Sequence, residues 1–410
     1  MIKSTLFISA LKWYNCYMIG QLIFFGLSFL VTYTASFYKK SKKIFFFCFA
    51  LYIMILACFS YTNNDTEIYM NERNMNFGKI RTKDIGFGVY MFLCQKIGFS
   101  FRQFRLISYL LGFLFLFYSV YKVSKENSFI ALLVYFLYPF IYDNIETRNF
   151  LAYSIFTLAL VILNYSQNHK YIKFFILVLV GSIFHKIILI YAIPIVLYFL
   201  MRKTNYKKYL IYYDLFFVLL CVIGINKNFI TNILNTLPDF IKIIPGIDRN
   251  LSSTNNFGWI VNLATTISFY IFSRVTFSLT FNNFKEYSKS YCDFAEITFF
   301  LSYFGCCLVP FYILSGDFLR VIRNLVLINA AVFSYLFIFN KINFKANRML
   351  VSTMAIVSLL CIEILNIYYA NLEVILIYDT FVNCYFFNGF KLKYEFYERY
   401  LYWNLKIQGV

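Results

Sequence analysis

The chain has 410 residues, a length that in a soluble protein corresponds to two or three domains. Its composition excludes a soluble protein, because 61% of the residues are hydrophobic and only 14% are charged, against about 25% in an ordinary globular protein. The same values exclude an intrinsically disordered chain, and the net charge of +19 is typical of a membrane protein with basic cytoplasmic loops.

Apolar runs follow one another along the chain, and each is a candidate membrane span. About 20 mostly apolar residues are needed to cross the hydrocarbon core of a bilayer. The runs are apolar on every side, which favours helices over the alternating strands of a membrane barrel. The sequence therefore predicts an all-α polytopic membrane protein with about twelve transmembrane helices, at 16–37, 44–61, 103–121, 128–142, 150–166, 172–184, 187–201, 209–225, 259–279, 294–314, 321–340 and 349–370.

One pair of runs is open to two interpretations. The runs 172–184 and 187–201 are short and are separated only by His185 and Lys186. They are compatible with a tight helical hairpin or with a single broken segment.

Basic residues are concentrated in alternate loops, and this pattern predicts the orientation of the chain. The basic loops, predicted to be cytoplasmic by the positive-inside rule, contain Lys39, Lys40, Lys42, Lys43, Lys122, Lys125, Lys170, Lys173, Arg202, Lys203, Lys207, Lys208, Lys285, Lys289, Lys341, Lys345 and Arg348. The loops between them, predicted to be extracytoplasmic, contain Asp65, Glu67, Glu72, Asp84, Asp143, Glu146, Asp239, Asp248 and Asp317.

The predicted organisation is one polytopic membrane domain at 1–370, followed by a C-terminal tail at 371–410 whose side of the membrane the pattern leaves open. Two outer loops are long, at 62–102 and 226–258. Within the first, the stretch 85–98 is too short and too rich in glycine to span, so we expect a re-entrant or interfacial helix there.

Polar residues at the predicted outer helix ends are the candidate functional groups, since a charge near hydrocarbon costs about 2.5–3.5 kcal/mol and usually lines a cavity or has a partner. Asp65 and Tyr69 are spaced by one helical turn, so both can face the same cavity. Asp65 could accept a hydroxyl proton. Its alternative role is that of a solvated loop acid capping the helix that follows.

Arg148 and His185 each lie where an outer loop meets a helix. The planar guanidinium suits phosphate oxygens, although an interfacial arginine could equally pair with Glu146 or Asp143. The imidazole can donate to a phosphate or accept a proton near neutral pH, and its alternative is a hydrogen-bonded interfacial histidine.

Arg320 and Arg323 are three positions apart and therefore share one face of a predicted helix. Two guanidiniums at the outer boundary predict a pyrophosphate clamp. The alternative is a pair of interfacial anchors, one of them neutralised by Asp317. The outer ends of several helices thus predict a cationic pocket for an anionic lipid-linked substrate, formed by Arg148, His185, Lys186, Arg320 and Arg323.

Familiar catalytic signatures are absent from the sequence. It contains no P-loop, no GxSxG, no zinc-type spacing of His and Cys, and no GxGxxG fingerprint. Energy for any reaction must therefore come from the substrate or from an ion gradient.

Several of these sparse positions form a pattern. Arg148 opens a helix, an apolar hairpin ending in Phe184 and His185 follows, and Asp65 with Tyr69 comes earlier in the chain. The glycine-aromatic pair at Gly86 and Phe87 and the F-x-R run at 318–320 complete it. This pattern resembles the EpsG-like family of bacterial polysaccharide polymerases, which are Wzy-type proteins of O-antigen, capsule and exopolysaccharide clusters. Lys186 departs from the small residue that the family commonly has after the histidine.

The resemblance implies a GT-C-like fold and a glycosyltransferase in the bacterial cytoplasmic (inner) membrane. A growing glycan on undecaprenyl pyrophosphate would be transferred to a fresh lipid-linked repeat unit. Because the lipid pyrophosphate is already an activated leaving group, neither a nucleotide nor a metal cofactor is implied. The expected partners are the lipid-linked donor and acceptor, the bilayer, a flippase and a chain-length regulator, with no nucleic acid.

The resemblance also implies roles for individual residues. Arg148, Arg320 and Arg323 would bind the pyrophosphate and stabilise its growing charge. Asp65 would be the catalytic base, with His185 as a catalytic group near the phosphates and Tyr69 in the substrate site.

Other functions stay open at this point. A flippase for the same lipid-linked units would also have about twelve helices and cationic residues, but it should carry charges at mid-membrane on many helices. Another lipid-linked glycosyltransferase or an O-acetyltransferase of the same pathway is a second alternative, and a purely structural membrane subunit is a third.

Overall fold

The computed structural model describes residues 42–59, 85–137, 139–202, 206–226, 230, 232, 258–282, 287–314 and 316–336. All the regular elements in these ranges are helices, which confirms the all-α class. The predicted spans 16–37 and 349–370, the tail 371–410, and the candidate residues Asp65 and Tyr69 lie outside the described residues.

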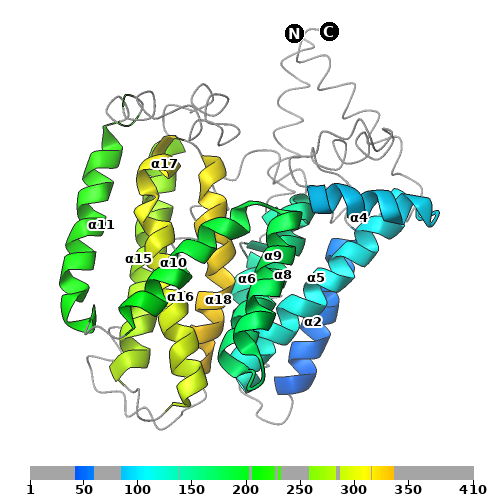
Figure 1. Ribbon diagram of the computed structural model, residues 1–410, viewed down its shortest axis with the longest axis horizontal. Coiled ribbons are helices and arrows are strands. Elements are labelled where there is room, and N and C mark those ends of the chain that lie inside the picture. Colours follow the sequence, from blue (N-terminus) through cyan, green and yellow to red (C-terminus); the bar gives the residue numbers. More distant parts are fainter. Residues whose placement is uncertain are drawn as a thin grey trace, which may run out of the picture.

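The described part of each predicted span from 44–61 to 321–340 is largely helical (Figure 1). The elements are α2 (Lys42–Phe59), α4 (Ile85–Lys96), α5 (Phe101–Ser124), η2 (Lys125–Asn127), α6 (Ser128–Leu137), α7 (Pro139–Ile145), α8 (Thr147–Tyr165), α9 (Lys170–Phe184), α10 (Ile187–Met201), η3 (Tyr206–Tyr209), α11 (Leu210–Ile225), α15 (Gly258–Asn282), α16 (Lys289–Cys307), α17 (Val309–Leu314), η5 (Gly316–Leu319) and α18 (Arg320–Leu336).

Some predicted spans are interrupted. The run 128–142 divides into α6 and α7 before Pro139, where the missing proline N–H is tolerated because that residue opens the new helix. The run 294–314 lies in α16 and α17, which are separated at Leu308. The runs 172–184 and 187–201 form two helices with a two-residue turn, so the hairpin alternative is confirmed.

Three stretches of the described chain are long and apolar enough to cross a membrane, at Gln103–Phe136, Thr147–Tyr165 and Trp259–Phe281. Further apolar helices, including α10 and α11, are shorter. The short helix expected at 85–98 is present as α4, which contacts α9 and α5 and runs across the ends of the upright helices in Figure 1.

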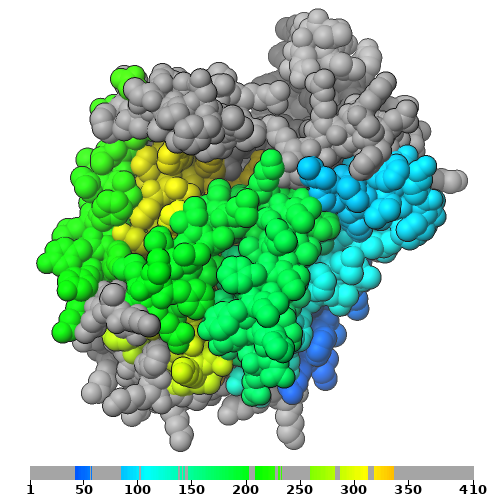
Figure 2. Space-filling view, in the orientation of Figure 1, coloured from blue at the N-terminus to red at the C-terminus, as the bar shows by residue number. Residues whose placement is uncertain are grey.

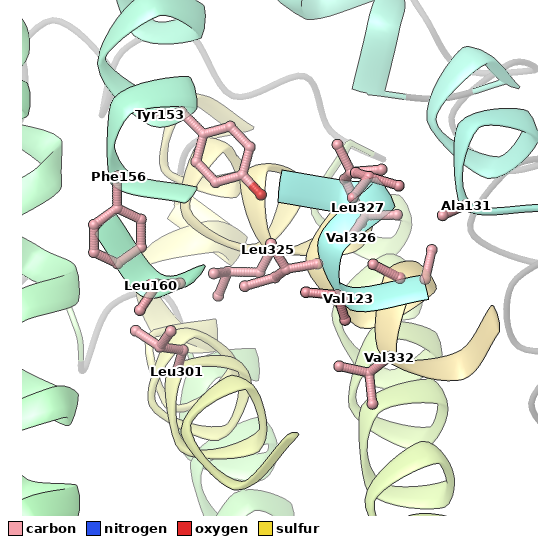
Figure 3. Packing of buried hydrophobic residues seen from close by; sticks show 14 of the residues in the cluster. Val123, Ala131, Tyr153, Phe156, Leu160, Leu301, Leu325, Val326, Leu327 and Val332 are labelled. Atoms are coloured by element: carbon pink, nitrogen blue, oxygen red, sulfur yellow. The ribbon is translucent and has the colours of Figure 1, made fainter. Parts of the chain in front are cut away.

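The centre of the bundle is α18. From Val321 to Leu336 every residue of this helix is buried, and its main neighbours are α6, α16, α5 and α15. Figure 3 shows the packing around it, with labelled side chains from α5, α6, α8, α16 and α18 itself: Val123, Ala131, Tyr153, Phe156, Leu160, Leu301, Leu325, Val326, Leu327 and Val332.

The surface of the bundle is apolar, in contrast to that of a soluble protein. Helices α9, α10 and α11 cover much of the face seen in Figure 2 and expose large apolar side chains, among them Phe175, Leu200 and Leu215. An extensive exposed apolar surface is suited to lipid rather than to water.

Polar contacts join helix ends that the charge pattern assigns to one side. The Lys42 ammonium donates to the Asn127 side chain at 2.9 Å, and the Asn127 amide donates to the carbonyl of Ser334 at 3.3 Å. Arg202 and Asp293 form an ion pair at 3.1 Å between α10 and α16. The opposite ends of α8, α9 and α18 meet at the candidate site described next.

Candidate functional site

The centre of the candidate site is a carboxylate held between two guanidiniums. Glu146 lies between α7 and α8 and is only 8% exposed. Arg323 Nη2 donates to its Oε2 at 2.7 Å, and Arg320 Nε lies 3.3 Å from its Oε1. Both arginines belong to the first turn of α18, so the expectation that they share one face is confirmed.

The backbone explains why Glu146 projects toward α18. It is the N-cap residue of α8, with φ −95° and ψ 60°, and its side chain makes no cap hydrogen bond. Its N–H donates to the carbonyl of Tyr142, and its own carbonyl accepts from Phe150 N–H. The carboxylate is therefore available to the arginines, while its charge still stabilises the N-terminus of α8.

Neighbouring side chains fix this arrangement. Asn149 and Asn324 exchange amide hydrogen bonds of 3.1 and 3.2 Å across α8 and α18, and Asn149 also donates to Glu146 Oε2 at 3.3 Å. The Arg323 guanidinium lies 4.1 Å from the centre of the Tyr142 ring, a cation–π geometry. A buried polar network with these mutual contacts keeps Glu146 and Arg323 in one orientation.

The charges of the cluster act on the ionisation of Glu146, which lies between the candidate membrane spans. Burial by itself raises the pKa of this carboxyl, but the positive charges of Arg323 and Arg320 outweigh burial and hold the pKa below its usual value. His185 contributes in the same direction. Glu146 is therefore ionised at neutral pH.

His185 ends α9 in an extended conformation, at the turn into α10. Its Nδ1 accepts the Ile187 backbone N–H at 3.2 Å, so Nε2 is the nitrogen that carries the proton of the neutral ring. Its effect on Glu146 places it with the arginine cluster. Lys186, which the sequence grouped with it, is exposed in the same turn.

A second buried carboxylate, that of Asp143, comes three positions before Glu146 in the chain. Asp143 on α7 is 2% exposed, and its Oδ2 accepts the hydroxyl of Tyr135 at 2.9 Å. Its Oδ1 is buried and has no hydrogen-bond partner in the described part of the chain. Burial raises the pKa of Asp143 to about 7, an effect that Arg323 and Tyr135 partly oppose. The two acids of one short segment thus have opposite pKa shifts.

The structure therefore brings together most of the predicted residues that it describes. Arg320, Arg323 and His185 surround Glu146, and Arg148 lies partly exposed in the first turn of α8, next to Asn149. Among the described residues, no group of three His, Cys, Asp or Glu side chains could hold a metal ion.

The sequence did not identify the two acids as site residues. Glu146 and Asp143 entered only as alternative partners of Arg148, because nothing in a single sequence distinguishes them from other acids of the outer loops. The available signal was two acids three positions apart directly before a predicted helix. Only packing against Arg323 and Tyr135 gives them different environments.

Comparisons with known proteins agree with this picture of an apolar helical membrane protein. No curated protein and no solved structure matches the chain. The family model described as the EpsG family matches residues 44–386, a range that includes every described helix from α4 to α18 and most of α2. The resemblance carried by Arg148, Phe184 and His185 is therefore confirmed, and the chain belongs to the EpsG family.

Proposed function

We propose that the protein is a glycosyltransferase that polymerises undecaprenyl-pyrophosphate-linked oligosaccharide repeat units into a surface polysaccharide. EpsG family membership suggests a polymerase of polysaccharide biosynthesis.

The observation that carries the proposal is the convergence of Arg320 and Arg323 on one point beside His185. The two guanidiniums are held by Glu146 at a spacing that a small dianion can bridge, because one carboxylate already contacts both. A lipid diphosphate presents several oxygens to the same donors. The diphosphate would bind beside the Glu146 carboxylate or displace it from between the two arginines.

The same donors suit the chemical step. As the bond from the sugar C1 to the diphosphate breaks, negative charge grows on the leaving oxygen, and donors fixed before the reaction stabilise that charge without reorganising. Arg148 and His185 would add donors from α8 and α9. Asp65 and Tyr69, for which the family resemblance implies the roles of base and substrate contact, lie outside the described residues.

The proposed setting is the bacterial cytoplasmic membrane, with about twelve spans, a GT-C-like fold and the arginine cluster at the outer face. The clustering of basic residues at the ends opposite to Glu146 supports this orientation through the positive-inside rule. A flippase and a chain-length regulator are the proposed protein partners.

Deletion of the gene, followed by gel separation of the surface glycans, tests the function. We expect the ladder of long chains to disappear while single-repeat material is kept, and a plasmid copy of the gene should restore the ladder. Loss of all surface glycan, with single-repeat units retained inside the cell, would instead identify a flippase.

A further inference from the structure

Asp143 and Glu146 are carboxylates three positions apart with different surroundings. Two guanidiniums hold Glu146, and its oxygens also accept from Asn149. Asp143 has one hydroxyl donor on Oδ2 and a buried Oδ1 with no hydrogen-bond partner in the described ranges. Glu146 is thus committed to the arginines, whereas Asp143 has an oxygen that can take a proton.

Hydroxyl groups from four helices surround Asp143. Tyr135 of α6 donates to its carboxylate at 2.9 Å, and Tyr109 of α5 donates to its backbone carbonyl at 3.2 Å. Tyr153 of α8 and Tyr191 of α10 interact electrostatically with the Asp143 carboxylate, and the Tyr191 hydroxyl donates to the carbonyl of Val321 at 2.9 Å. In Figure 3 the Tyr153 ring projects from α8 toward α18 with its hydroxyl leading. Aromatic rings with hydroxyl groups provide both the apolar faces and the hydrogen bonds that a sugar ring uses.

We propose that Asp143 is the group that takes the proton of the acceptor sugar's hydroxyl, with the tyrosines around it forming the acceptor subsite. This inference rests on the proposed function. A hydroxyl at Asp143 Oδ1 lies three positions along the chain from the carboxylate that marks where the donor's diphosphate binds. Both acids also interact with the Arg323 guanidinium, so the acceptor hydroxyl and the diphosphate would meet around one residue.

The step balances without a further reactant. The acceptor O–H bond breaks and its proton goes to Asp143 Oδ1, while the acceptor oxygen forms a bond to C1 of the donor. The bond from C1 to the diphosphate breaks at the same time, and the lipid diphosphate leaves with the electron pair on the side of Arg320 and Arg323.

Burial of Asp143 fits this role and sets a condition on it. An enclosed carboxylate keeps water away from the activated donor, so hydrolysis is suppressed. Asp143 is 2% exposed, so the acceptor can reach it only when the side chains packed around it move. A proton acceptor with a pKa of about 7 also matches catalysis near neutral pH.

The test uses purified full-length protein in nanodiscs and the lipid-linked repeat unit extracted from the deletion strain. We expect the wild-type rate to rise with pH through about 7, since the base must be ionised. Asp143→Asn should lower the rate about 10²–10⁴-fold and remove this rise, while binding of undecaprenyl pyrophosphate is kept. The titratable or charged groups facing Asp143 are Arg323, Glu146, Tyr109, Tyr135, Tyr153 and Tyr191.

Tyr135→Phe is the second variant. It removes a hydrogen bond that stabilises the ionised carboxylate, so the midpoint of the rate profile should move to higher pH, with the rate recovering at alkaline pH. If Asp143→Asn does not fold, this shift of the midpoint still tests whether Asp143 takes the proton. The matched control is Glu296→Gln on α16. Glu296 is also a buried carboxylate that accepts a tyrosine hydroxyl, donated by Tyr198 at 3.2 Å. Its pH profile should equal that of the wild type.

The outcomes separate the two proposals. Absence of polymer with wild-type protein overturns the proposed function and this inference with it. Polymer from wild type, together with an unchanged rate and profile in Asp143→Asn, overturns the inference alone. If Asp65→Asn then loses both the rate and its rise with pH, the base is Asp65. An unshifted midpoint in folded Tyr135→Phe also contradicts the role of Asp143.

Discussion

Arg323 is the residue on which the candidate site depends most directly. Its guanidinium donates to Glu146 at 2.7 Å and stacks on Tyr142, and it is 5% exposed. Arginine suits this position because one planar group makes the ion pair and the ring contact together, which the compact ammonium of lysine does not. Removing one partner of a buried ion pair leaves the other charge uncompensated.

We therefore expect Arg323→Ala to lower the free energy of unfolding by about 3–5 kcal/mol. Adding Glu146→Gln should restore part of this loss, since the buried carboxylate that has lost its nearer guanidinium is then replaced by a neutral amide. Thermal unfolding in one detergent measures both. The control is Arg202→Ala, which breaks the more exposed ion pair with Asp293 and should cost less than about 1 kcal/mol. Equal losses in the two arginine variants would contradict the buried ion pair.

Activity gives a second prediction for the same residue. Arg323→Lys keeps a positive charge near Glu146 but loses the planar donor and the stack on Tyr142. We expect polymer formation in the nanodisc assay to fall about 10²-fold, the usual effect of losing one donor to a developing negative charge. A lysine variant as active as the wild type would show that this position contributes charge alone.

The positions of single helices depend on small residues at their contacts and on breaks between helices. The packing of α5 on α8 depends on Gly112, where an added Cβ would collide with the ring of Phe150. That ring is fully buried and packs against Tyr109 and Phe113, so it has little room to move. Close approach of helices at small residues is the usual source of packing energy in membrane proteins.

Gly112→Ala should consequently destabilise the protein by about 1–3 kcal/mol through overpacking, although alanine is the better helix former. Thermal unfolding in detergent measures the effect. Leu114→Ala on the same helix is the control, because Leu114 is 56% exposed on the outer surface and should have a small effect. If Gly112→Ala were the more stable of the two, the contact with Phe150 would be wrong.

In the whole molecule, the helix ends that the loop charges assign to the cytoplasm lie together, away from the candidate site. Lys42, Lys125 and Lys289 stand at one set of helix ends, while Glu146, His185 and the first turn of α18 form the other. The apolar surface of α9, α10 and α11 lies between these two ends. Such an arrangement predicts that the two ends face opposite sides of a membrane.

Cysteine labelling checks this orientation. Glu126→Cys and Lys186→Cys place thiols at exposed positions on opposite ends of the bundle. In spheroplasts, we expect a membrane-impermeant maleimide to label the cysteine at 186 and to label that at 126 only after permeabilisation. The parent chain, with its native cysteines, gives the background. Labelling at 126 in intact spheroplasts, with 186 labelled only after permeabilisation, would place the arginine cluster on the cytoplasmic side and contradict the proposed function.

The apolar runs of the sequence were enough to predict the all-α class and the positions of the apolar helices in the described ranges. The spacing of its charges singled out Arg320, Arg323 and His185 as candidate site residues. These follow from local properties, namely the length of an apolar run, the spacing of charges along a helix and the position of a break. They need no knowledge of which helix packs on which.

What those residues contact depends on how the helices pack against one another. Arg323 and Glu146 are 177 positions apart, and their pairing depends on α18 packing beside the α7–α8 junction. The contrast between Glu146 and Asp143 has the same origin, because their pKa shifts come from the neighbours that packing supplies: guanidiniums for one, and a buried surround with a single hydroxyl donor for the other. Periodicity and composition describe each helix alone, whereas the chemistry of this site arises between helices.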